Sequence, residues 1–397
     1  MQFSGQKSDV VHLDINSCFA TIEQQANPNL RNKPIVVCAY DSPFSIILAS
    51  SIDAKRLGIK TGMKLSEGRA IYPKLIHLMP DPPKYRSVHK KIKKILEVYS
   101  EKVIPRSIDE YVFKLAEIYH NPQKTCQTIK QRIKEEVGEY ITVSIGISTN
   151  RYLAKIASNL QKPDGLVEIN KNNFLKAYSK INLTDLTGIK KGNARRLRLI
   201  GVKTVLQFYN SPISRLKIAF GGITGLYWYM RLHGFEIDDF KSKRRTFGNS
   251  FAPKKEISHK IHEILTKLCE KTGFRLRSAG FFANGVHLSI HFRNGAYWHK
   301  GVKTKEILFE SRDIYKEVKR LLSLCPQKDL PRIIAISVFN LSKKSNLQLN
   351  FFEDLLKKEK LASSIDEINH KWGNFTIYPA RMANMGEIIT DRIAFGK

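Results

Sequence analysis

Short apolar runs and one long amphipathic segment predict how the first half of the chain folds. Apolar residues dominate positions 10–13, 34–40, 45–50 and 141–147, and runs of this length between turn-forming residues are typical of buried strands. Between the runs 45–50 and 141–147, residues 85–99 repeat apolar side chains at helical spacing and carry lysines on the other side. We therefore expect a sheet that is covered by this helix.

The second half contains a segment with strict two-residue alternation, residues 285–293. Its apolar members should face a core: Val286, Leu288, Ile290 and Phe292. Its polar members should form an outer face: His287, Ser289, His291 and Arg293. Residues 332–341 predict another strand of the same sheet, and a chain of 397 residues has room for about two to four domains. The predicted fold class is α+β with several domains.

Two adjacent carboxylates, Asp109 and Glu110, follow the apolar approach of residues 103–105 and lead into the apolar-rich run 112–115. This pattern places an acidic pair at the edge of a buried sheet. Neighbouring carboxylates repel each other and resist ionising together, and a divalent metal ion is the usual remedy. The stretch therefore predicts a metal site.

The tetrapeptide Ser-Ile-Asp-Glu occurs twice, at residues 107–110 and again at 364–367. Around the second copy, apolar residues fall at helical spacing: Leu361, Ile365, Ile368 and Trp372. We expect a helix there whose solvated face carries Asp366 and Glu367. The tetrapeptide alone is therefore a weak signal for a metal site.

A third acid, Asp14, ends the predicted strand 10–13. Taken alone, it fits an ordinary strand-end cap. Together with Asp109 and Glu110 it matches a site for two Mg²⁺ ions, because hard cations take oxygen ligands and bridging carboxylates can hold two of them. Phe19 follows one helical turn later, where it fits either a wall of that site or plain core packing.

The charge balance predicts a polyanionic partner. The chain has 67 Lys and Arg against 36 Asp and Glu, a net charge of +31, which favours nucleic acid and binding that weakens with salt. An anionic membrane surface remains the alternative, but the basic clusters at 90–94, 190–198 and 241–245 are spread along the chain and fit a long groove better. The five cysteines are scattered, and no run is long enough to span a bilayer. We expect a cytoplasmic protein with neither disulfides nor a membrane partner.

In order, these motifs resemble those of the Y-family DNA polymerases, the translesion class. The matching stretches are Asp14 to Phe19 with Glu23, Ser107 to Glu110, Ser144 to Ser148 with Asn150, Lys155 to Ser158, and Lys162 to Gly165. The alternation of predicted strands and helices in the first half fits a ferredoxin-like sheet with helices on one face. The resemblance implies a right-hand fold with this sheet as its palm, small fingers, a helical thumb and an α/β little finger. It also implies that Asp14, Asp109, Glu110 and the Ile15 carbonyl bind the metal ions, that Phe19 is the steric gate against ribonucleotides, and that Lys162 binds the triphosphate.

The chain departs from the family pattern on the small basic helix of residues 52–57. The family commonly has Tyr and Arg where this chain has Ile52 and Lys55. Lysine keeps the charge without the planar fork of arginine, and Arg56 is a candidate to compensate. These basic residues fit either triphosphate binding or a solvated surface. Asn16 replaces a frequent second Asp, which makes the resemblance closer to the UmuC branch than to the DinB branch.

Several basic segments are expected to contact DNA. Residues 186–197 resemble a helix-hairpin-helix through Gly188 and Gly192, although Lys190 stands where a further glycine is expected; an ordinary helical connection is the alternative. The other expected DNA contacts are Lys243, Arg244 and Arg245 in a basic linker, and Arg293 on the outer face of the alternating strand.

The resemblance implies the following domains: palm at 9–25 and 81–170, fingers at 26–80, thumb at 171–238, linker at 239–249, little finger at 250–345, and a tail at 346–397. Within the tail, the pentapeptide 348–352 resembles the bacterial sliding-clamp-binding motif through Gln348, Leu349, Phe351 and Phe352; an edge strand is the alternative. A clamp-binding motif would place the source among bacteria or their mobile elements.

The function implied is low-fidelity, template-directed DNA synthesis for translesion synthesis, in which dNTPs are added to a primer with two Mg²⁺ ions. Primer–template DNA, the sliding clamp and an SOS accessory protein are the expected partners, at the nucleoid. A catalytically weak or silent clamp-docked scaffold that needs an accessory protein is one rival, and intact Asp14, Asp109 and Glu110 argue against it. A nucleotide cyclase is the other, and it would have no use for the hairpin or clamp motifs.

Overall fold

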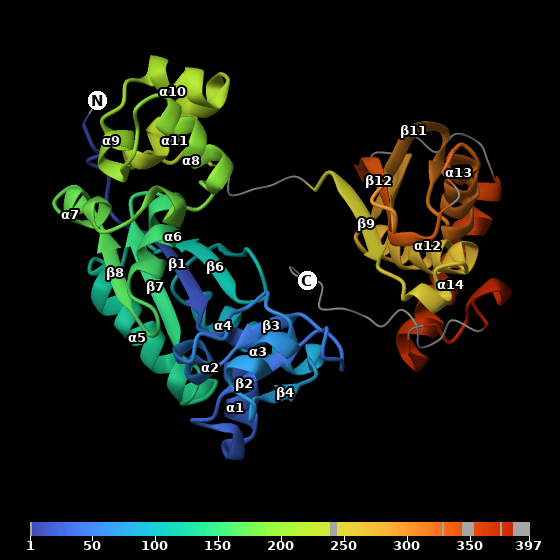
Figure 1. Ribbon diagram of the computed structural model, residues 1–397, viewed down its shortest axis with the longest axis horizontal. Coiled ribbons are helices and arrows are strands. Elements are labelled where there is room, and N and C mark those ends of the chain that lie inside the picture. Colours follow the sequence, from blue (N-terminus) through green and yellow to red (C-terminus); the bar gives the residue numbers. More distant parts are fainter. Residues whose placement is uncertain (1, 239–243, 328, 344–352, 374, 384–397) are drawn as a thin grey trace. The chain divides into compact units, whose positions relative to one another are not determined.

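The computed structural model describes residues 2–238, 244–327, 329–343, 353–373 and 375–383 (Figure 1). These residues form two compact units, which follow one another in the chain on either side of residues 239–243. We refer to them as the N-terminal unit and the C-terminal unit and describe each by itself. Lys243 and the pentapeptide 348–352 lie outside the described residues.

The N-terminal unit is built on a five-stranded sheet with the order β5-β6-β1-β7-β8 (Figure 1). Its strands are β1 (Val10–Ile15), β5 (Val103–Pro105), β6 (Glu110–Lys114), β7 (Val143–Ser148) and β8 (Leu166–Ile169). The central strand β1 runs antiparallel to both β6 and β7. Four helices belong to this part: α1 (Cys18–Ala26), α4 (Pro82–Leu96), α5 (Pro122–Glu136) and α6 (Arg151–Leu160).

Helices cover both faces of this sheet. Val11 and Leu13 of β1 share one buried cluster with Ile92 of α4 and Ile129 of α5. The other face receives α6, and its close approach requires glycine at 146, where a Cβ would come within 2.0 Å of the Ala154 carbonyl oxygen. The expectation that the helices lie on one face is therefore wrong. That face also carries the even-numbered residues of β1, because side chains alternate along a strand.

A small second sheet has the order β3-β2-β4. It consists of β2 (Ile35–Cys38), β3 (Ile47–Ser50) and β4 (Ile76–Leu78), with η1 (Pro28–Leu30), α2 (Ile52–Arg56) and α3 (Leu65–Ile71) beside it. Ser51 caps α2 by accepting a hydrogen bond from the amide of Ala54 at 3.1 Å. The sheet packs on α1, and this packing brings the basic helix α2 close to the start of α1.

The remainder of the N-terminal unit is helical. It comprises α7 (Phe174–Ser179), η2 (Leu183–Asp185), α8 (Lys191–Leu199), α9 (Val205–Tyr209), α10 (Ile213–Phe220) and α11 (Ile223–Leu232). Their buried residues form one cluster with Leu153 and Ile156 of α6. The sheet and the helical part thus share α6, which has one side on each.

The C-terminal unit is a four-stranded sheet with the order β11-β10-β12-β9. Its elements are β9 (Thr246–Phe251), η3 (Lys255–Ile257), α12 (Ile261–Ser278), β10 (Phe281–Phe292), β11 (Tyr297–Leu308), α13 (Ser311–Ser323), β12 (Pro331–Lys343), α14 (Glu353–Trp372) and η5 (Ala380–Met382). The four apolar residues of the alternating segment are buried with α12 and α13, as predicted. Because β9 begins at Thr246, the last four residues of the predicted linker belong to a strand.

The second Ser-Ile-Asp-Glu lies in α14, as predicted, but its acidic face is not simply solvated. Asp366 forms an ion pair through both carboxylate oxygens with Arg277 of α12, at 2.7 and 2.8 Å, whereas Leu361 and Trp372 are 60% and 69% exposed. The prediction for Asp366 was wrong because the guanidinium of Arg277, only 9% exposed, requires a carboxylate partner. Among the described residues, we find no helix whose length and apolar character would let it cross a membrane.

Candidate active site

Asp14 and Glu110 face each other across two neighbouring strands. Asp14 near the end of β1 is the direct register partner of Glu110, the first residue of β6. Residues paired in this way project from the same face of a sheet, so both carboxylates lie on the face that carries α6. Asp109 immediately precedes β6, and its carbonyl accepts a hydrogen bond from the Ile15 amide at 2.9 Å. The fold thus places the three acids that the sequence singles out at the ends of two neighbouring strands.

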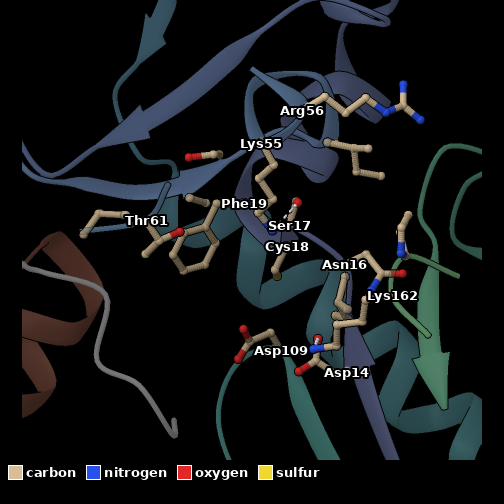
Figure 2. A pocket seen from close by; sticks show the side chains of 16 residues that line it. Asp14, Asn16, Ser17, Cys18, Phe19, Lys55, Arg56, Thr61, Asp109 and Lys162 are labelled. Carbon is tan, nitrogen blue, oxygen red and sulfur yellow. Dashed lines mark hydrogen bonds and ion pairs between the residues drawn. The ribbon is translucent and has the colours of Figure 1, made fainter. Parts of the chain in front are cut away.

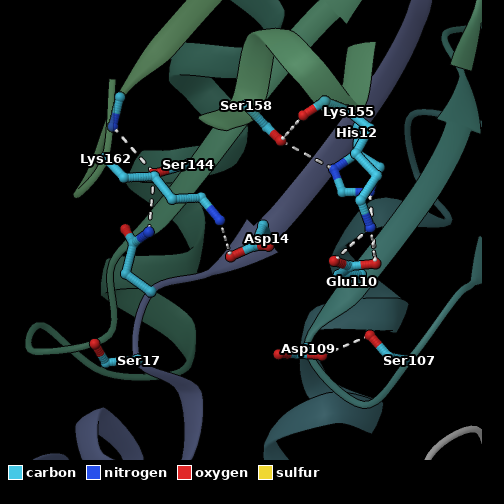
Figure 3. Close-up of polar contacts among 12 residues, drawn as sticks. His12, Asp14, Ser17, Ser107, Asp109, Glu110, Ser144, Lys155, Ser158 and Lys162 are labelled. Atoms are coloured by element: carbon cyan, nitrogen blue, oxygen red, sulfur yellow. Dashed lines mark hydrogen bonds and ion pairs between the residues drawn. The ribbon is translucent and has the colours of Figure 1, made fainter. Parts of the chain in front are cut away.

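Two of these carboxylates are held by lysines (Figure 3). Lys162 Nζ lies 2.9 Å from Asp14 Oδ1, and Lys155 Nζ lies 2.7 Å from both oxygens of Glu110. Asp109 accepts instead a hydrogen bond from the Ser107 hydroxyl. Sequence reasoning included Lys155 in a motif but gave it no role, because the motif does not show which carboxylate the lysine reaches.

The two lysine-held carboxylates differ in their pKa values. Burial raises the pKa of Asp14 despite the nearby charge of Lys162. Burial would raise the pKa of Glu110 too, but the His12 ring, 3.8 Å away, and the hydrogen-bonded ammonium group of Lys155 outweigh it and lower that pKa to about 2. Glu110 is therefore a firmly ionised carboxylate, whereas ionised Asp14 is destabilised by its surroundings.

The donor set suits a hard divalent cation. Asp14, Asp109 and Glu110 supply carboxylate oxygens, the ligands that Mg²⁺ prefers. In the part of the chain that the structure describes, no three His, Cys, Asp or Glu side chains are gathered closely enough to hold a metal ion. The cations beside Asp14 and Glu110 are lysine ammonium groups, so charge compensation is already required at this place. The residues fit a metal ion, and a rearrangement of these lysines would accompany its binding.

A cavity of about 550 Å³ opens beside the carboxylates (Figure 2). Asp14, Asp109 and Lys162 lie at one end, and Phe19 and Lys55 lie farther along. This volume is in the range of small-molecule binding sites, about 300–1,000 Å³. The cavity thus connects the acidic strand ends to the small second sheet.

Phe19 forms a fixed wall of this cavity. Its side chain is buried, 5% exposed, and its ring stacks on Tyr85 of α4 with centroids 4.5 Å apart. The Tyr85 hydroxyl in turn donates a hydrogen bond to Glu23, one turn beyond Phe19 on α1, at 2.8 Å. Phe19 therefore belongs both to the core and to the cavity wall, the two alternatives that the sequence left open.

The basic helix α2 contributes Lys55 to the cavity. Lys55 Nζ donates a hydrogen bond to the Ser17 hydroxyl at 2.8 Å, and burial together with the charge of Lys162 lowers the pKa of Lys55. Arg56 also lines the cavity, but its side chain is 74% exposed and its guanidinium lies 3.4 Å from Asp53. In Figure 2 this guanidinium points away from the carboxylates.

Asn16 has a structural role that the sequence did not reveal. Its buried amide donates to the Ser144 hydroxyl at 2.8 Å, and its carbonyl oxygen accepts from the Asp164 amide at 2.8 Å. A carboxylate could not donate the first bond. Asn16 therefore ties the end of β1 to β7 and to the turn that carries Lys162.

Glu110 lines a second cavity in the N-terminal unit, of about 340 Å³, and not the first one. Its other walls include His12 and Lys155 from the sheet side and Gly188 and Trp228 from the helical part. Gly188 has a positive φ of 89°, which favours glycine. The predicted hairpin turn therefore opens onto the same face of the sheet as the acids.

The remaining predicted hairpin residues follow this turn. Lys190 precedes α8 as its N-cap, and Gly192 lies in the first turn of that helix. In the C-terminal unit, the Arg244 guanidinium lies over the Phe247 ring at 4.7 Å, and Arg245 directly precedes β9. Arg293 follows β10 and donates to the Pro253 carbonyl at 2.8 Å.

Two models of one protein family match the chain. The impB/mucB/samB family matches residues 13–159, and the impB/mucB/samB family C-terminal domain matches residues 242–351. The chain is similar to a DNA polymerase IV from Oceanobacillus iheyensis, with 27% identity over 392 residues, 94% of this chain and 92% of that protein. It is also similar to a DNA polymerase IV from Bacteroides fragilis, with 27% identity over 361 residues, 87% of this chain and 96% of that protein.

Among solved structures, a Y-family DNA polymerase chimera of Dbh and Dpo4 has a similar fold. Its TM-score is 0.72 at 23% identity, and the match covers 83% of this chain and 98% of that one. This likeness confirms the predicted fold class. Because the two matching family regions together span more than half of the chain, the chain belongs to the impB/mucB/samB family, the Y-family DNA polymerases, which are DNA-directed DNA polymerases of translesion synthesis.

Proposed function

We propose that the chain adds deoxynucleotides from dNTPs to a primer 3′-OH at the strand ends that carry Asp14, Asp109 and Glu110. The observation that supports this most directly is the 550 Å³ cavity, which has carboxylates at one end and the lysines Lys55 and Lys162 on its walls. A nucleoside triphosphate has the charge and size for such a cavity. The primer would approach Glu110 from the second, 340 Å³ cavity.

DNA polymerases of this family use divalent metal ions. In this chain we assign two Mg²⁺ ions to Asp14, Asp109, Glu110 and the Ile15 carbonyl. When bound, Mg²⁺ stabilises the negative charge that develops during phosphoryl transfer and lowers the pKa of an attacking hydroxyl. The carboxylates hold the ions, and their own negative charge explains why a polyanionic triphosphate needs the lysines nearby.

The other cavity residues position the nucleotide. Lys162 and Lys55 would offset charge on the β- and γ-phosphates, and Lys162 would exchange Asp14 for the phosphates. Phe19, fixed by its stacking on Tyr85, would stand against the sugar and exclude a ribose 2′-OH. Positioning and electrostatics provide most of the catalysis of phosphoryl transfer, so a side-chain base is not required.

Each part of the fold has its own role in this DNA synthesis. We assign the palm to 9–25 and 81–170, the fingers to 26–80, the thumb to 171–238 and the little finger to 250–345. Gly188, Lys190 and Gly192 of the thumb would bind DNA phosphates. Lys243, Arg244 and Arg245 of the basic linker and Arg293 of the little finger would add further contacts, and the net charge of +31 supports such a partner.

We also propose three finer assignments that rest on sequence. Gln348, Leu349, Phe351 and Phe352 would bind a bacterial sliding clamp. Asn16 and Lys55 support a place nearer the UmuC branch than the DinB branch, and an SOS accessory protein would then be a partner. Work on chromosomal DNA would place the protein in the cytoplasm at the nucleoid.

Sugar discrimination tests this function and its nucleotide site together. Single-nucleotide incorporation of a dNTP and of the matching rNTP is measured on primed DNA with Mg²⁺ for wild type and Phe19→Ala. We expect dNTP incorporation by both, and a loss of about tenfold or more in discrimination for Phe19→Ala. Phe44→Ala, on an aromatic that is 70% exposed, is the control. Unchanged discrimination would remove Phe19 as the gate, and absence of all incorporation, even with clamp and accessory protein, would contradict the function.

A further inference from the structure

Glu110 is the one of the three acids whose two carboxylate oxygens are both held by a cation. Lys155 Nζ lies 2.7 Å from each oxygen (Figure 3), whereas Lys162 approaches Asp14 through one oxygen, Oδ1. Asp109 meets the Ser107 hydroxyl, which carries no charge. A divalent cation at Glu110 therefore has to compete directly with an ammonium group.

The surroundings of Glu110 restrict where its carboxylate can turn. His12 Nε2 lies 3.8 Å from Glu110 Oε2, and His12 is buried and hydrogen-bonded to Ser158 of α6 at 3.2 Å. On the other side stands Asp14, the cross-strand partner of Glu110. Asp14 and Glu110 project from the same face of the sheet, so a cation between them could bind both carboxylates once Lys155 leaves.

The second cavity indicates what would attract Lys155 away from Glu110. Arg106, Arg151, Arg231 and Lys155 all line it. Arg231 already forms an ion pair with Asp238 through two bonds of 2.6 and 3.0 Å, and Arg151 lies 3.6 Å from the same carboxylate. Lys155 is bound to Glu110, and Arg106 has no carboxylate partner among the described residues, so Arg106 can attract an incoming anion to this wall. A phosphate of a nucleic-acid backbone fits such a wall, and the flexible stem of lysine lets its ammonium group exchange partners.

We propose that Lys155 is a positioning residue that couples DNA binding to metal binding. It holds Glu110 in the free protein, and a backbone phosphate of bound DNA draws it away, which leaves Glu110 free to bind a divalent cation together with Asp14. This inference rests on the proposed metal site. By thermodynamic reciprocity, DNA strengthens metal binding by the same factor by which the metal strengthens DNA binding.

Metal affinity in the absence of nucleotide tests the coupling without any chemistry. Mn²⁺ binding is titrated by the electron paramagnetic resonance of the free ion, with and without primer–template DNA, and binding to DNA alone is subtracted. For wild type we expect DNA to tighten Mn²⁺ binding about tenfold, a typical size for coupling between two sites. For Lys155→Met and Lys155→Gln we expect binding without DNA that is already as tight as wild type with DNA, and almost no further gain.

Two controls separate this inference from the proposed function. Lys114→Met removes another ion pair of the same strand, Lys114 with Asp9 at 3.4 Å, and should keep the wild-type coupling. Glu110→Ala should lose the tight binding. If Glu110→Ala binds Mn²⁺ like wild type, the proposed site is wrong. If Glu110→Ala loses binding but the Lys155 variants keep the full effect of DNA, or bind no more tightly without it, the site stands and the role of Lys155 is overturned.

Discussion

The same four residues, Ser-Ile-Asp-Glu, have different fates in the two units. In residues 107–110 the acids enter the edge of the central sheet, where Glu110 faces Asp14 and two cavities open. In residues 364–367 they lie on α14, where both oxygens of Asp366 are bound by Arg277. An acid beside other acids and a cavity remains available to a metal ion and a substrate. An acid whose two oxygens are both bound by an arginine guanidinium stabilises the fold.

The largest expected difference between the two copies is catalytic. Glu110→Ala should lower the rate of nucleotide incorporation by about a thousandfold, since electrostatic stabilisation of the transition state depends on the metal-binding carboxylates. Glu367→Ala, the matched change on an exposed residue of α14, should leave the rate unchanged. Single-turnover incorporation measures the rates, and DNA-binding titrations should show that both variants still bind DNA. Equal rates for Glu110→Ala and Glu367→Ala would mean that the two copies do not differ in function.

The second copy should show its effect on stability and not on catalysis. Asp366→Ala leaves the guanidinium of Arg277 without its partner at a site where the arginine is 9% exposed. Breaking a buried ion pair on one side is costly, and we expect the free energy of unfolding to fall by about 2 kcal/mol. Urea unfolding of the full chain, with the C-terminal unit followed by hydrogen exchange, measures the loss. If Asp366→Ala is as stable as wild type, the ion pair with Arg277 does not contribute measurably to stability.

Acid sensitivity should distinguish Glu110. Its pKa falls from 4.5 to about 2 on folding, so its ionised form stabilises the fold above the unfolded pKa, and this stabilisation disappears as the pH falls toward 2. Glu110→Gln lacks this contribution. Between about pH 5 and about pH 3, wild type should lose about 2 kcal/mol more stability than Glu110→Gln in urea titrations. Equal losses would mean that Lys155 and His12 do not hold the carboxylate.

The smallest expected effect is that of Asn16, whose hydrogen bonds hold the end of β1 near the first copy. Asn16→Asp removes the hydrogen bond to Ser144 and adds a charge near the acids, so we expect a loss of about 1 kcal/mol in stability. The KM for dNTP should rise a few-fold because the turn that carries Lys162 is loosened. Asn29→Asp, on an exposed residue, is the control for the change in charge. An unchanged KM for dNTP would mean that this turn does not affect nucleotide binding.

Local patterns in the sequence predict much of this fold. The apolar runs predict β1, β2, β3 and β7, and the helical spacing of residues 85–99 predicts α4, because the buried face of each element repeats with the period of its backbone. The alternation in β10 is confirmed for the same reason. Gly146 in the apolar run could not reveal that α6 covers the second face, since the need for glycine arises from a contact with a helix that comes later in the chain.

The candidate site, too, contains residues that local patterns predict and residues whose roles depend on contacts formed by folding. Asp14, Asp109 and Glu110 could be grouped because acids at strand ends meet at the edge of a sheet. The roles of Lys155, His12 and Asn16 depend on which side chains lie opposite them after folding, and spacing along the chain does not encode that. The prediction for Asp366 was wrong for the same reason, because the spacing of its apolar neighbours does not show that Arg277 of α12 lies beside it after folding.

The central claim is that the position of the first Ser-Ile-Asp-Glu, and not its sequence, makes it a polymerase site. Primer extension with Mg²⁺ and all four dNTPs, at a temperature where circular dichroism shows every variant folded, compares wild type with Asp109→Asn and Asp366→Asn. We predict extension by wild type and Asp366→Asn and none by Asp109→Asn, with DNA binding kept in all three. Extension by Asp109→Asn at the wild-type rate would contradict the account.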